Sequence, residues 1–293
     1  MGGLDAARGD HTKTVFVAGS GRGGTTWLSE LIDHDASYRR IFEPFHPGKV
    51  EDFRGFASKQ YLRPHDRRTG FLDPARKVLE GRLRNRWTER GGAFVARRRL
   101  VKDIRANLLL GWLAQNFPGM PIVLLMRHPC AVVASRLELG WRDNLDETMG
   151  QKELVEDHLL EVEERIRAAR DPFERHLLLW CIDNHVPLRQ FAPGDIHLCF
   201  YEELFADPEP NLRRLFAFVG RDFDEAVLEK VRRPSSTSRR GARPDVDGWR
   251  HLLDRRQVRK AQEILGLFDL DRIYGSDPVP NADAARAIMG AGG

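Results

Sequence analysis

The chain has 293 residues, of which 41% are hydrophobic and 9% aromatic, with 47 lysines and arginines against 43 aspartates and glutamates. This length and apolar content are enough to bury the core of one α/β domain, and they exclude a small disulfide-stapled scaffold and a mainly disordered chain. The net charge of +4 is small, but arginine far outnumbers lysine, and because guanidinium groups pair well with phosphate and sulfate, we expect an anionic ligand.

The first predicted unit is a strand, a glycine-rich loop and a helix. Residues 14–18 (TVFVA) are apolar and β-branched, as in a buried strand. Residues 19–24 are rich in glycine, and helical sequence follows from residue 25 to about residue 33. This order is typical of the ligand-binding edge of an α/β sheet.

Three further apolar segments predict buried strands, each followed by helical sequence. They are residues 100–104, 121–126 and 197–201, with helices expected over 107–116 and from about 130 to 139. Residues 41–43 are consistent with one more strand end. Short apolar strands that alternate with helices indicate an α/β fold, in which helices cover both faces of a central parallel sheet and the crossovers are right-handed.

The remaining segments complete the predicted organisation. The arginine-rich residues 53–99 are interpreted as a helical excursion over the carboxyl edge of the sheet, with a solvated basic face as the plainer alternative. A charged helix is expected over 153–170, and an amphipathic helix over 172–191 with Asp171 as its N-cap and Pro172 at its first position. Residues 231–248 predict a polar loop, and the apolar residues at 258, 261, 265 and 268 keep helical spacing. We expect one domain over 13–275 between flexible ends at 1–12 and 276–293.

Cysteine, histidine and hydropathy patterns bear on metal sites and compartment. Cys130, Cys181 and Cys199 have no paired spacing, and the histidines form no zinc-type cluster, so we expect no metal site and a reducing compartment. No run of about 18 apolar residues is present, and the first residues lack the pattern of a signal peptide. These features predict a soluble, cytoplasmic protein without an integral membrane segment.

The glycine-rich loop carries the strongest chemical signal. Gly19 to Gly24 has the spacing G-x-x-x-x-G of a phosphate loop, but Thr25 stands where the Walker lysine is expected. Such a loop between a strand and a helix directs backbone N–H groups and the positive end of the helix at one anion. The sequence therefore predicts an anion site, while the missing lysine argues against γ-phosphate chemistry.

Residues 20–28 (SGRGGTTWL) resemble the 5′-phosphosulfate loop of sulfotransferases that use 3′-phosphoadenosine 5′-phosphosulfate (PAPS). The resemblance implies a fold similar to that of P-loop nucleotide kinases, and PAPS as the donor. Many cytosolic members of this family have a lysine where this chain has Arg22. The resemblance implies that the Arg22 side chain reaches the bridging oxygen of the donor. The loop residues that the resemblance assigns to the donor are Arg22, Gly23, Gly24, Thr25, Thr26 and Trp27.

A second element of the resemblance lies at Arg127 and Ser135. The family carries an arginine at a strand end and a serine eight residues later on the next helix, both on the 3′-phosphate, and the spacing here agrees. A strand-end arginine faces the ligand edge of the sheet, and a serine about two turns into the helix can lie on the same side. The resemblance therefore implies that this pair binds the 3′-phosphate.

Weaker matches extend the resemblance from about residue 13 to about residue 274. Residues 200–204 (FYEEL) are similar to a family segment that would place Tyr201 near the adenine. Arg239, Arg240 and Gly241 resemble a late basic element that closes on the 3′-phosphate, and residues 249–250 (WR) also match.

The general base is where the chain departs from part of the family. Cytosolic phenol and steroid sulfotransferases use a histidine two residues after a strand lysine, and here Lys102 matches the lysine but Ile104 stands at the histidine position. Many carbohydrate and bacterial members have a Glu-Pro pair after the first helix, which Glu43 and Pro44 match. We therefore expect Glu43 to be the base that accepts the proton of the acceptor. His46 is the reserve candidate, and Lys102 is a candidate for stabilising the leaving group.

These features together predict a PAPS-dependent O-sulfotransferase that acts without a metal. The expected acceptor is a hydroxyl-bearing small molecule or glycan, with a sugar or another aliphatic alcohol favoured over a phenol because Glu43 replaces a histidine. No nucleic-acid partner is expected, and the oligomeric state is left open. The alternatives are a P-loop small-molecule kinase, which Thr25 argues against, and a non-enzymatic polyanion-binding protein that uses the arginines of residues 53–99.

Overall fold

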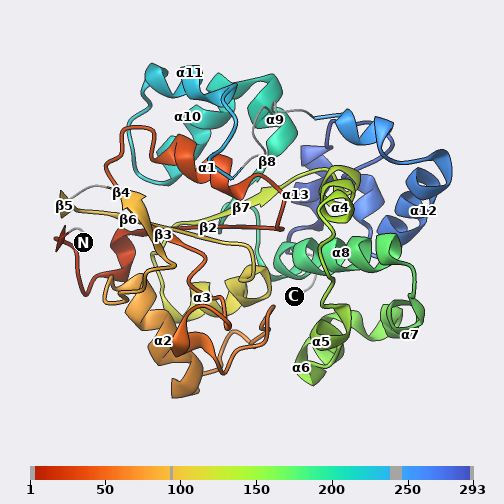
Figure 1. The fold of residues 1–293 in the computed structure, drawn as a ribbon, viewed down its shortest axis with the longest axis horizontal. Coiled ribbons are helices and arrows are strands. Elements are labelled where there is room, and N and C mark those ends of the chain that lie inside the picture. Colours follow the sequence, from red (N-terminus) through yellow and green to blue (C-terminus); the bar gives the residue numbers. More distant parts are fainter. Residues whose placement is uncertain (1–3, 93–94, 238–245, 291–293) are drawn as a thin grey trace.

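The computed structural model describes residues 4–92, 95–237 and 246–290, and within them a six-stranded sheet has the order β4-β3-β6-β2-β7-β8 (Figure 1). Its strands are β2 (Thr14–Gly19), β3 (Arg39–Phe42), β4 (Glu89–Gly92), β6 (Arg99–Asp103), β7 (Ile122–Met126) and β8 (His197–Phe200). All are parallel except β4, which pairs antiparallel with β3 at one edge. A separate parallel pair consists of β1 (Leu4–Asp5) and β5 (Val95–Ala96).

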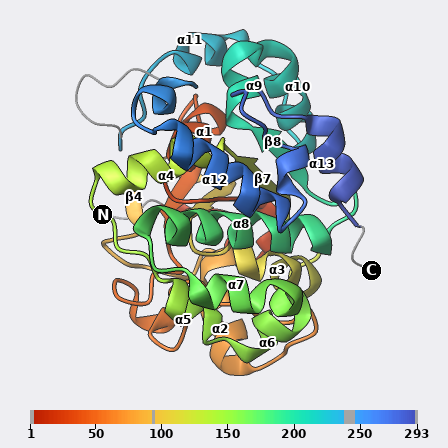
Figure 2. The same cartoon turned by 90° about the vertical axis from the view of Figure 1, so that its right-hand side faces the viewer.

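Helices cover both faces of this sheet. The longer ones are α1 (Thr25–Ile32), α2 (Thr69–Leu79), α3 (Leu110–Asn116), α4 (Pro129–Glu138), α8 (Pro172–Gln190), α10 (Pro208–Phe218) and α12 (Arg255–Gly266). The shorter ones are α5 (Leu145–Met149), α6 (Lys152–Leu154), α7 (Glu163–Ala168), α9 (Tyr201–Ala206), α11 (Leu228–Val231) and α13 (Ala282–Ile288). In Figure 1, α1, α9, α10 and α11 lie on one side of the sheet, whereas α2, α3 and α8 lie on the other. Figure 2, turned by 90°, shows α12 and α13 on the same flank as α8.

The alternation of side chains along β2 explains why two hydrophobic cores form. Phe16 and Ala18 belong to the larger core, which includes residues of α2, α3, α4, α8 and α12, whereas Val15 and Val17 belong to the core that α1 and α10 cover. Successive side chains of a strand point to opposite faces, so a strand that is apolar throughout needs cover on both sides. The predicted parallel sheet with helices on both faces is confirmed.

The predicted strands lie within about one residue of the observed ones. The strand β2 continues through Gly19, β6 ends at Asp103 and leaves Ile104 just outside, and β8 ends at Phe200, so Tyr201 begins α9. Residues 41 and 42 belong to β3, which is paired with β6. Because these strands are parallel, the segments that follow them meet at one edge of the sheet, where ligands bind in open α/β folds.

The interpretation of residues 53–99 as a helical excursion over the carboxyl edge is wrong for the helix itself, although Trp87 and Arg90 of this segment line a cleft at that edge. The helix α2 packs on a face of the sheet, and its last carbonyl, Leu79 O, accepts a 2.7 Å hydrogen bond from Thr14 Oγ1 at the start of β2. The same segment supplies β4, which pairs through backbone groups at the sheet edge. The sequence of β4 (ERGG) has no apolar alternation, so periodicity gave no signal for it.

The charged helix predicted over residues 153–170 is also interrupted. The helices α6 and α7 are separated by a π turn over residues 155–159 and a 3-10 turn over residues 160–162. Leu154 and Leu159, five residues apart, are both fully buried. Since a π turn has an i→i+5 hydrogen-bond pattern, it brings such a pair towards one face, and burial of both leucines outweighs regular helix geometry here.

The helices predicted over 172–191 and around residues 258–265 are observed as α8 and α12, but the predicted amphipathic character of α8 is wrong and Phe268 lies just beyond α12. Asp171 accepts a 3.1 Å hydrogen bond from Glu174 N, and Pro172 occupies the first turn of α8. Most residues of α8 are buried, so it is a core helix rather than an amphipathic surface helix. The helix α12 begins with a capping box made by Asp254 and Gln257.

The domain limits at residues 13 and 275 stay a prediction, and the structure describes contacts on both sides of them. Asp5, before the first limit, accepts hydrogen bonds from Arg99 (2.8 Å) and Arg39 (3.2 Å). Beyond the second limit, Ala285 and Ile288 of α13 are buried. In the predicted loop over 231–248, the described residues 232–237 form no helix or strand, and residues 238–245 lie outside the described part of the chain.

Candidate active site

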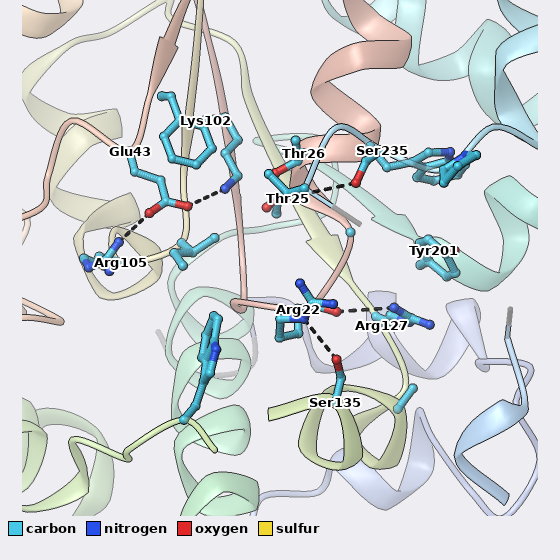
Figure 3. Close-up of a pocket in the computed structure, with 18 of the residues that line it drawn as sticks. Arg22, Thr25, Thr26, Glu43, Lys102, Arg105, Arg127, Ser135, Tyr201 and Ser235 are labelled. Atoms are coloured by element: carbon cyan, nitrogen blue, oxygen red, sulfur yellow. Dashed lines mark hydrogen bonds and ion pairs between the residues drawn. The ribbon is translucent and has the colours of Figure 1, made fainter. Parts of the chain in front are cut away.

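A cleft of about 510 Å³ opens at the carboxyl edge of the sheet. Figure 3 shows two groups of side chains facing it, one around Glu43 and one around Arg22, with Thr25 and Thr26 between them. The sequence-predicted residues that line the cleft are Arg22, Gly24, Thr25, Thr26, Trp27, Glu43, His46, Lys102, Arg127, Ser135 and Tyr201. The fold therefore gathers side chains from four strand ends and three helices in one place.

The loop between β2 and α1 is held in a shape that side chains would disturb. A Cβ atom on Gly19 would lie 2.6 Å from Leu125 O, and one on Gly23 would lie 2.7 Å from Ser20 O. Gly24 has a φ of +95° and forms the N-cap of α1, a conformation that glycine adopts without strain. Arg22 has a φ of 75° without being glycine, and such strain is concentrated at functional sites. The loop and the first turn of α1 thus form a preformed anion cradle.

Arg22, Arg127 and Ser135 meet beside this loop, as Figure 3 shows. Arg22 Nε donates to Ser135 Oγ at 3.0 Å, and Arg127 Nη1 donates to Arg22 O at 3.3 Å. The Arg127 guanidinium also lies 4.3 Å from the ring centroid of Tyr201, which is a cation–π distance. The loop, the end of β7, α4 and the start of α9 therefore present two guanidinium groups and a hydroxyl to one side of the cleft.

The opposite side of the cleft is built around Glu43, which directly follows β3. Its carboxylate accepts hydrogen bonds from Lys102 Nζ at 2.6 Å and from Arg105 Nη1 at 2.8 Å. The Glu43 side chain is only 8% exposed. Burial alone would raise the pKa of Glu43, but Lys102 and Arg105 outweigh it and hold this pKa below its usual range. The site thus contains a buried carboxylate that stays ionised.

Strand register explains why Glu43 and Lys102 meet. Phe42 pairs with Lys102 across β3 and β6, and Glu43 N donates a 2.7 Å hydrogen bond to Lys102 O. Glu43 has a φ of 44°, so the chain turns sharply there and aims the side chain back along the strand ends. Ile104 also lines the cleft, and it contributes an apolar wall.

His46, the reserve base, lies at the same side of the cleft. Its Nδ1 accepts a 3.2 Å hydrogen bond from Gly48 N, and its ring packs edge-on against Trp87. Burial, assisted by the Arg105 charge, lowers the pKa of His46. With Nδ1 accepting, the neutral ring carries its proton on Nε2 and has no nitrogen left to take another proton.

One predicted residue does not line the cleft, and three others lie outside the described residues. Gly23 shapes the loop, where its N–H donates a 2.8 Å hydrogen bond to Ser20 O, and it does not belong to the described cleft lining. Arg239, Arg240 and Gly241 lie outside the described residues, so their predicted role is a prediction still.

Sequence reasoning missed several residues of the site. Arg105 contacts Glu43 although it lies beyond the end of β6, and Trp87 and Trp141 line the walls of the cleft from irregular segments. A buried network beneath the loop was missed too: Asp183 accepts from Ser20 Oγ at 3.0 Å and pairs with Lys59. The only sequence signal for Asp183 was a carboxylate within the apolar run of α8, which needs a partner when it is buried.

The described residues also bear on metal binding, on cysteine pairing and on membrane-spanning helices. In the described ranges, no group of three or more histidine, cysteine, aspartate or glutamate residues is arranged to hold a metal ion. Cys130, Cys181 and Cys199 are buried and unpaired. No helix in the described part of the chain is long and apolar enough to cross a membrane. The predicted metal independence and compartment stay predictions.

Comparison with known sequences points to one family. A profile described as "Sulfotransferase family" matches residues 14–225. Human "Carbohydrate sulfotransferase 5" is 27% identical over 208 residues, which cover 64% of this chain and 48% of that protein. This chain thus spans about half the length of that curated relative.

Solved structures agree on the fold. The crystal structure of "mouse sulfotransferase SULT7A1 complexed with PAP" has a TM-score of 0.50 and 13% identity, covering 97% of this chain and 90% of that one. The sulfotransferase STF9 from Mycobacterium avium has a TM-score of 0.50 and 12% identity, covering 89% of this chain and 76% of that one. At such identities the likeness is one of fold, and it confirms the predicted P-loop-like architecture.

Proposed function

This chain is a member of the sulfotransferase family, and we propose that it transfers a sulfonate group from PAPS to a hydroxyl of a sugar or another aliphatic alcohol. The observation that carries the proposal is the meeting of Arg22, Arg127 and Ser135 in a cleft whose opposite wall holds Glu43. An anion site and an ionised base that face the same space are what sulfonyl transfer requires.

The donor would lie along the glycine-rich loop. The loop N–H groups, the first turn of α1 and the hydroxyls of Thr25 and Thr26 would bind the 5′-phosphosulfate, a role supported by the place of both threonines in the cleft lining. Arg127 and Ser135 would bind the 3′-phosphate, since a guanidinium offers paired donors to such a group. Tyr201, which lines the cleft and contacts Arg127, offers a ring for the adenine to pack on.

Transfer would proceed by direct in-line displacement. The acceptor oxygen bonds to sulfur while the bond from sulfur to the bridging 5′-phosphate oxygen breaks, and adenosine 3′,5′-bisphosphate (PAP) leaves. Glu43 takes the proton of the hydroxyl as the oxygen attacks. Arg22 and Lys102 supply positive charge to the leaving phosphate. No covalent intermediate with the protein is needed, because positioning and charge carry the reaction.

The hydrogen bonds of Glu43 favour it over His46 as the base. The Glu43 pKa is held low by two cations, so the carboxylate is ionised and ready to accept a proton at neutral pH. His46 has Nδ1 engaged by Gly48. Because its pKa is low, the Glu43 carboxylate is a weak base. A weak base suits a reaction in which the proton leaves late, after the acceptor oxygen has begun to bond to sulfur.

The proposal is tested by the products formed from two donors. The purified chain is incubated with a mixture of neutral and acidic saccharides and with one donor, either PAPS or ATP. The nucleotide and saccharide products are identified by mass spectrometry. We expect PAP and a sulfated saccharide from PAPS, and no consumption of ATP. Phosphorylated saccharide from ATP, or binding of polyanions without consumption of either donor, would overturn the proposal.

A further inference from the structure

A smaller hollow of about 140 Å³ adjoins the cleft, because Ile104, Arg105 and Trp141 line both. We call this hollow the side pocket. Its other lining residues are Gly21, Ser58, Lys59, Arg136, Arg142, Asn144, His176 and Leu179. The side pocket therefore lies directly beside the part of the cleft that contains Glu43 and Arg105.

The side pocket has an excess of positive charge. Lys59, Arg105, Arg136 and Arg142 line it, and among the described lining residues there is no carboxylate. Burial, together with the nearby Arg136 charge, lowers the pKa of His176, which adds no charge at neutral pH. Cationic side chains that line a half-enclosed pocket attract an anion more strongly than the same side chains do on an open surface.

Nearby carboxylates neutralise only part of this charge. Asp183 lies beneath the loop and pairs with Lys59, with Arg136 Nη2 3.9 Å from its other oxygen. Glu43 pairs with Lys102 and Arg105. These two carboxylates pair with four cations, Lys59, Arg136, Lys102 and Arg105, and neither of them pairs with Arg142.

Arg142 differs from the other cations of the side pocket. It is exposed, and it forms no hydrogen bond or ion pair within the described part of the chain. The other three are engaged with Asp183 or Glu43. Because its guanidinium is not used to hold the fold together, it is available to a ligand group that offers two oxygens side by side.

Trp141, next to Arg142, gives the side pocket an aromatic wall. Its side chain lies over the glycine-rich loop, since a Cβ atom on Gly21 would be 2.8 Å from Trp141 Cζ3. The residue is nevertheless 40% exposed. An exposed indole beside a cleft offers a flat apolar surface on which a ring-shaped ligand can pack.

From these observations we propose that the acceptor carries an anionic group, a carboxylate or a sulfate ester, which binds in the side pocket against Arg142 while its hydroxyl lies at Glu43. The inference rests on the proposed sulfotransfer function and narrows its substrate class to acidic saccharides or similar anionic alcohols. Arg105 belongs to both the cleft and the side pocket: its Nη1 lies 2.8 Å from Glu43 Oε2 in the cleft, and the residue also lines the side pocket.

The test compares three small probes on protein that is first saturated with PAP, so that the donor anion site is filled. The probes are methyl β-D-glucuronide, methyl β-D-glucoside 6-sulfate and the neutral methyl β-D-glucoside, titrated by calorimetry at constant ionic strength. We expect at least one anionic probe to bind about tenfold more tightly than the neutral one, as a charge-assisted contact provides. Which anionic probe binds more tightly distinguishes a carboxylate from a sulfate ester.

Arg142→Gln should abolish this preference and leave the affinity for PAP unchanged. The matched control is Arg97→Gln, because Arg97 is also exposed but lies just before the amino end of β6, and this variant should keep the preference. Equal binding of the three probes, no binding of any of them, or a preference that survives in Arg142→Gln would overturn the inference. Because PAP binding is measured first, a protein that does not bind PAP overturns the proposed function instead.

Discussion

Two buried glutamates at the carboxyl edge of the sheet have opposite electrostatic surroundings. Over the whole residue, Glu43 at the end of β3 is 6% exposed, and Glu202 just after β8 is 3% exposed. Glu43 is paired with Lys102 and Arg105, which hold its pKa below the usual range. Glu202 accepts hydrogen bonds from His128 N and Tyr274 Oη, both neutral groups, and burial raises its pKa to about 7.

The difference shows that burial alone does not make a carboxylate a candidate base. Glu202 is enclosed by His128 and Tyr274, whose rings pack edge-on against each other. Its two hydrogen bonds connect α9 to His128, which follows β7, and to Tyr274 in the C-terminal segment. Glu43 instead lines the cleft, and its charge is balanced by cations from the end of β6. Access to substrate and a stabilised negative charge together mark the functional glutamate, so substitutions at the two positions should have separate effects.

The largest expected effect is on turnover in Glu43→Gln. Glutamine keeps the shape of the side chain and one acceptor oxygen but takes no proton, so single-turnover transfer should fall by about 10² to 10⁴. The affinity for PAP, measured by calorimetry, should change far less than turnover, because Arg22, Arg127 and Ser135 lie across the cleft and the glutamine oxygen still accepts from Lys102. Glu202→Gln is the control, and it should retain turnover in the folded protein.

His46→Ala tests the rival base in the same assay. We expect it to keep most of its turnover, because His46 Nδ1 is engaged by Gly48. Loss of turnover in His46→Ala with retention in Glu43→Gln would show that the base has been assigned to the wrong residue.

The next effect in size is on donor recognition in Arg127→Ala. Charge-assisted hydrogen bonds contribute roughly 1.5 to 3 kcal/mol, so the affinity for PAP should fall by about ten- to a hundredfold. The preference for PAP over adenosine 5′-monophosphate, which lacks the 3′-phosphate, should disappear at the same time. If the variant preferred PAP as strongly as the parent does, Arg127 would not contact the 3′-phosphate.

A smaller effect should appear in the pH dependence of stability. Burial raises the folded pKa of Glu202 from 4.5 to about 7, so between these two pH values the folded state keeps a proton that the unfolded state releases. The free energy of unfolding therefore falls as pH rises from 4.5 to 7, by at most about 1.4 kcal/mol per pH unit. Glu43, with a lowered pKa, acts in the opposite sense, and its contribution is lost as pH falls through its folded pKa. Urea unfolding from pH 4.5 to 7 should show a flatter profile for Glu202→Gln. An unchanged slope would mean that Glu202 titrates normally.

The smallest expected effect is that of a chelator. Two cations already balance Glu43, and Thr25 replaces the lysine that accompanies magnesium-dependent phosphate loops. Turnover with PAPS should therefore be the same before and after treatment with EDTA. Activity that vanished with EDTA and returned with magnesium would favour kinase-like chemistry.

The strands and the glycine-rich loop were predictable because short apolar runs flanked by helices have few other packing solutions. Residues 14–18, for example, are buried on both faces and give a continuous apolar signal. The strand β4 was not predictable, because its residues ERGG have no apolar alternation and lie at a sheet edge. The interrupted helix over 152–168 was missed because burial of Leu154 and Leu159 overrides local helix propensity.

Within the site, resemblance identified the residues that carry a family spacing, and the structure added those that act through tertiary contact. Glu43 stood out by its Glu-Pro pair, and the structure supplies its two cationic partners, Lys102 and Arg105. Arg105 had no sequence signal because its role depends on the register between β3 and β6. Arg142 and Trp141 lie in an irregular segment after α4, where periodicity carries no information.

The central claim is that the cleft binds a nucleotide with both a 5′- and a 3′-phosphate, and a thermal-shift panel with PAP, ADP and ATP tests it most directly. A ligand that binds only the folded state stabilises it by about 2.7 kcal/mol at a hundredfold excess over its Kd. We expect PAP alone to raise the melting temperature of the protein, and Arg127→Ala to reduce that rise. Stabilisation by ADP or ATP equal to that by PAP, or no stabilisation by PAP, would contradict the account.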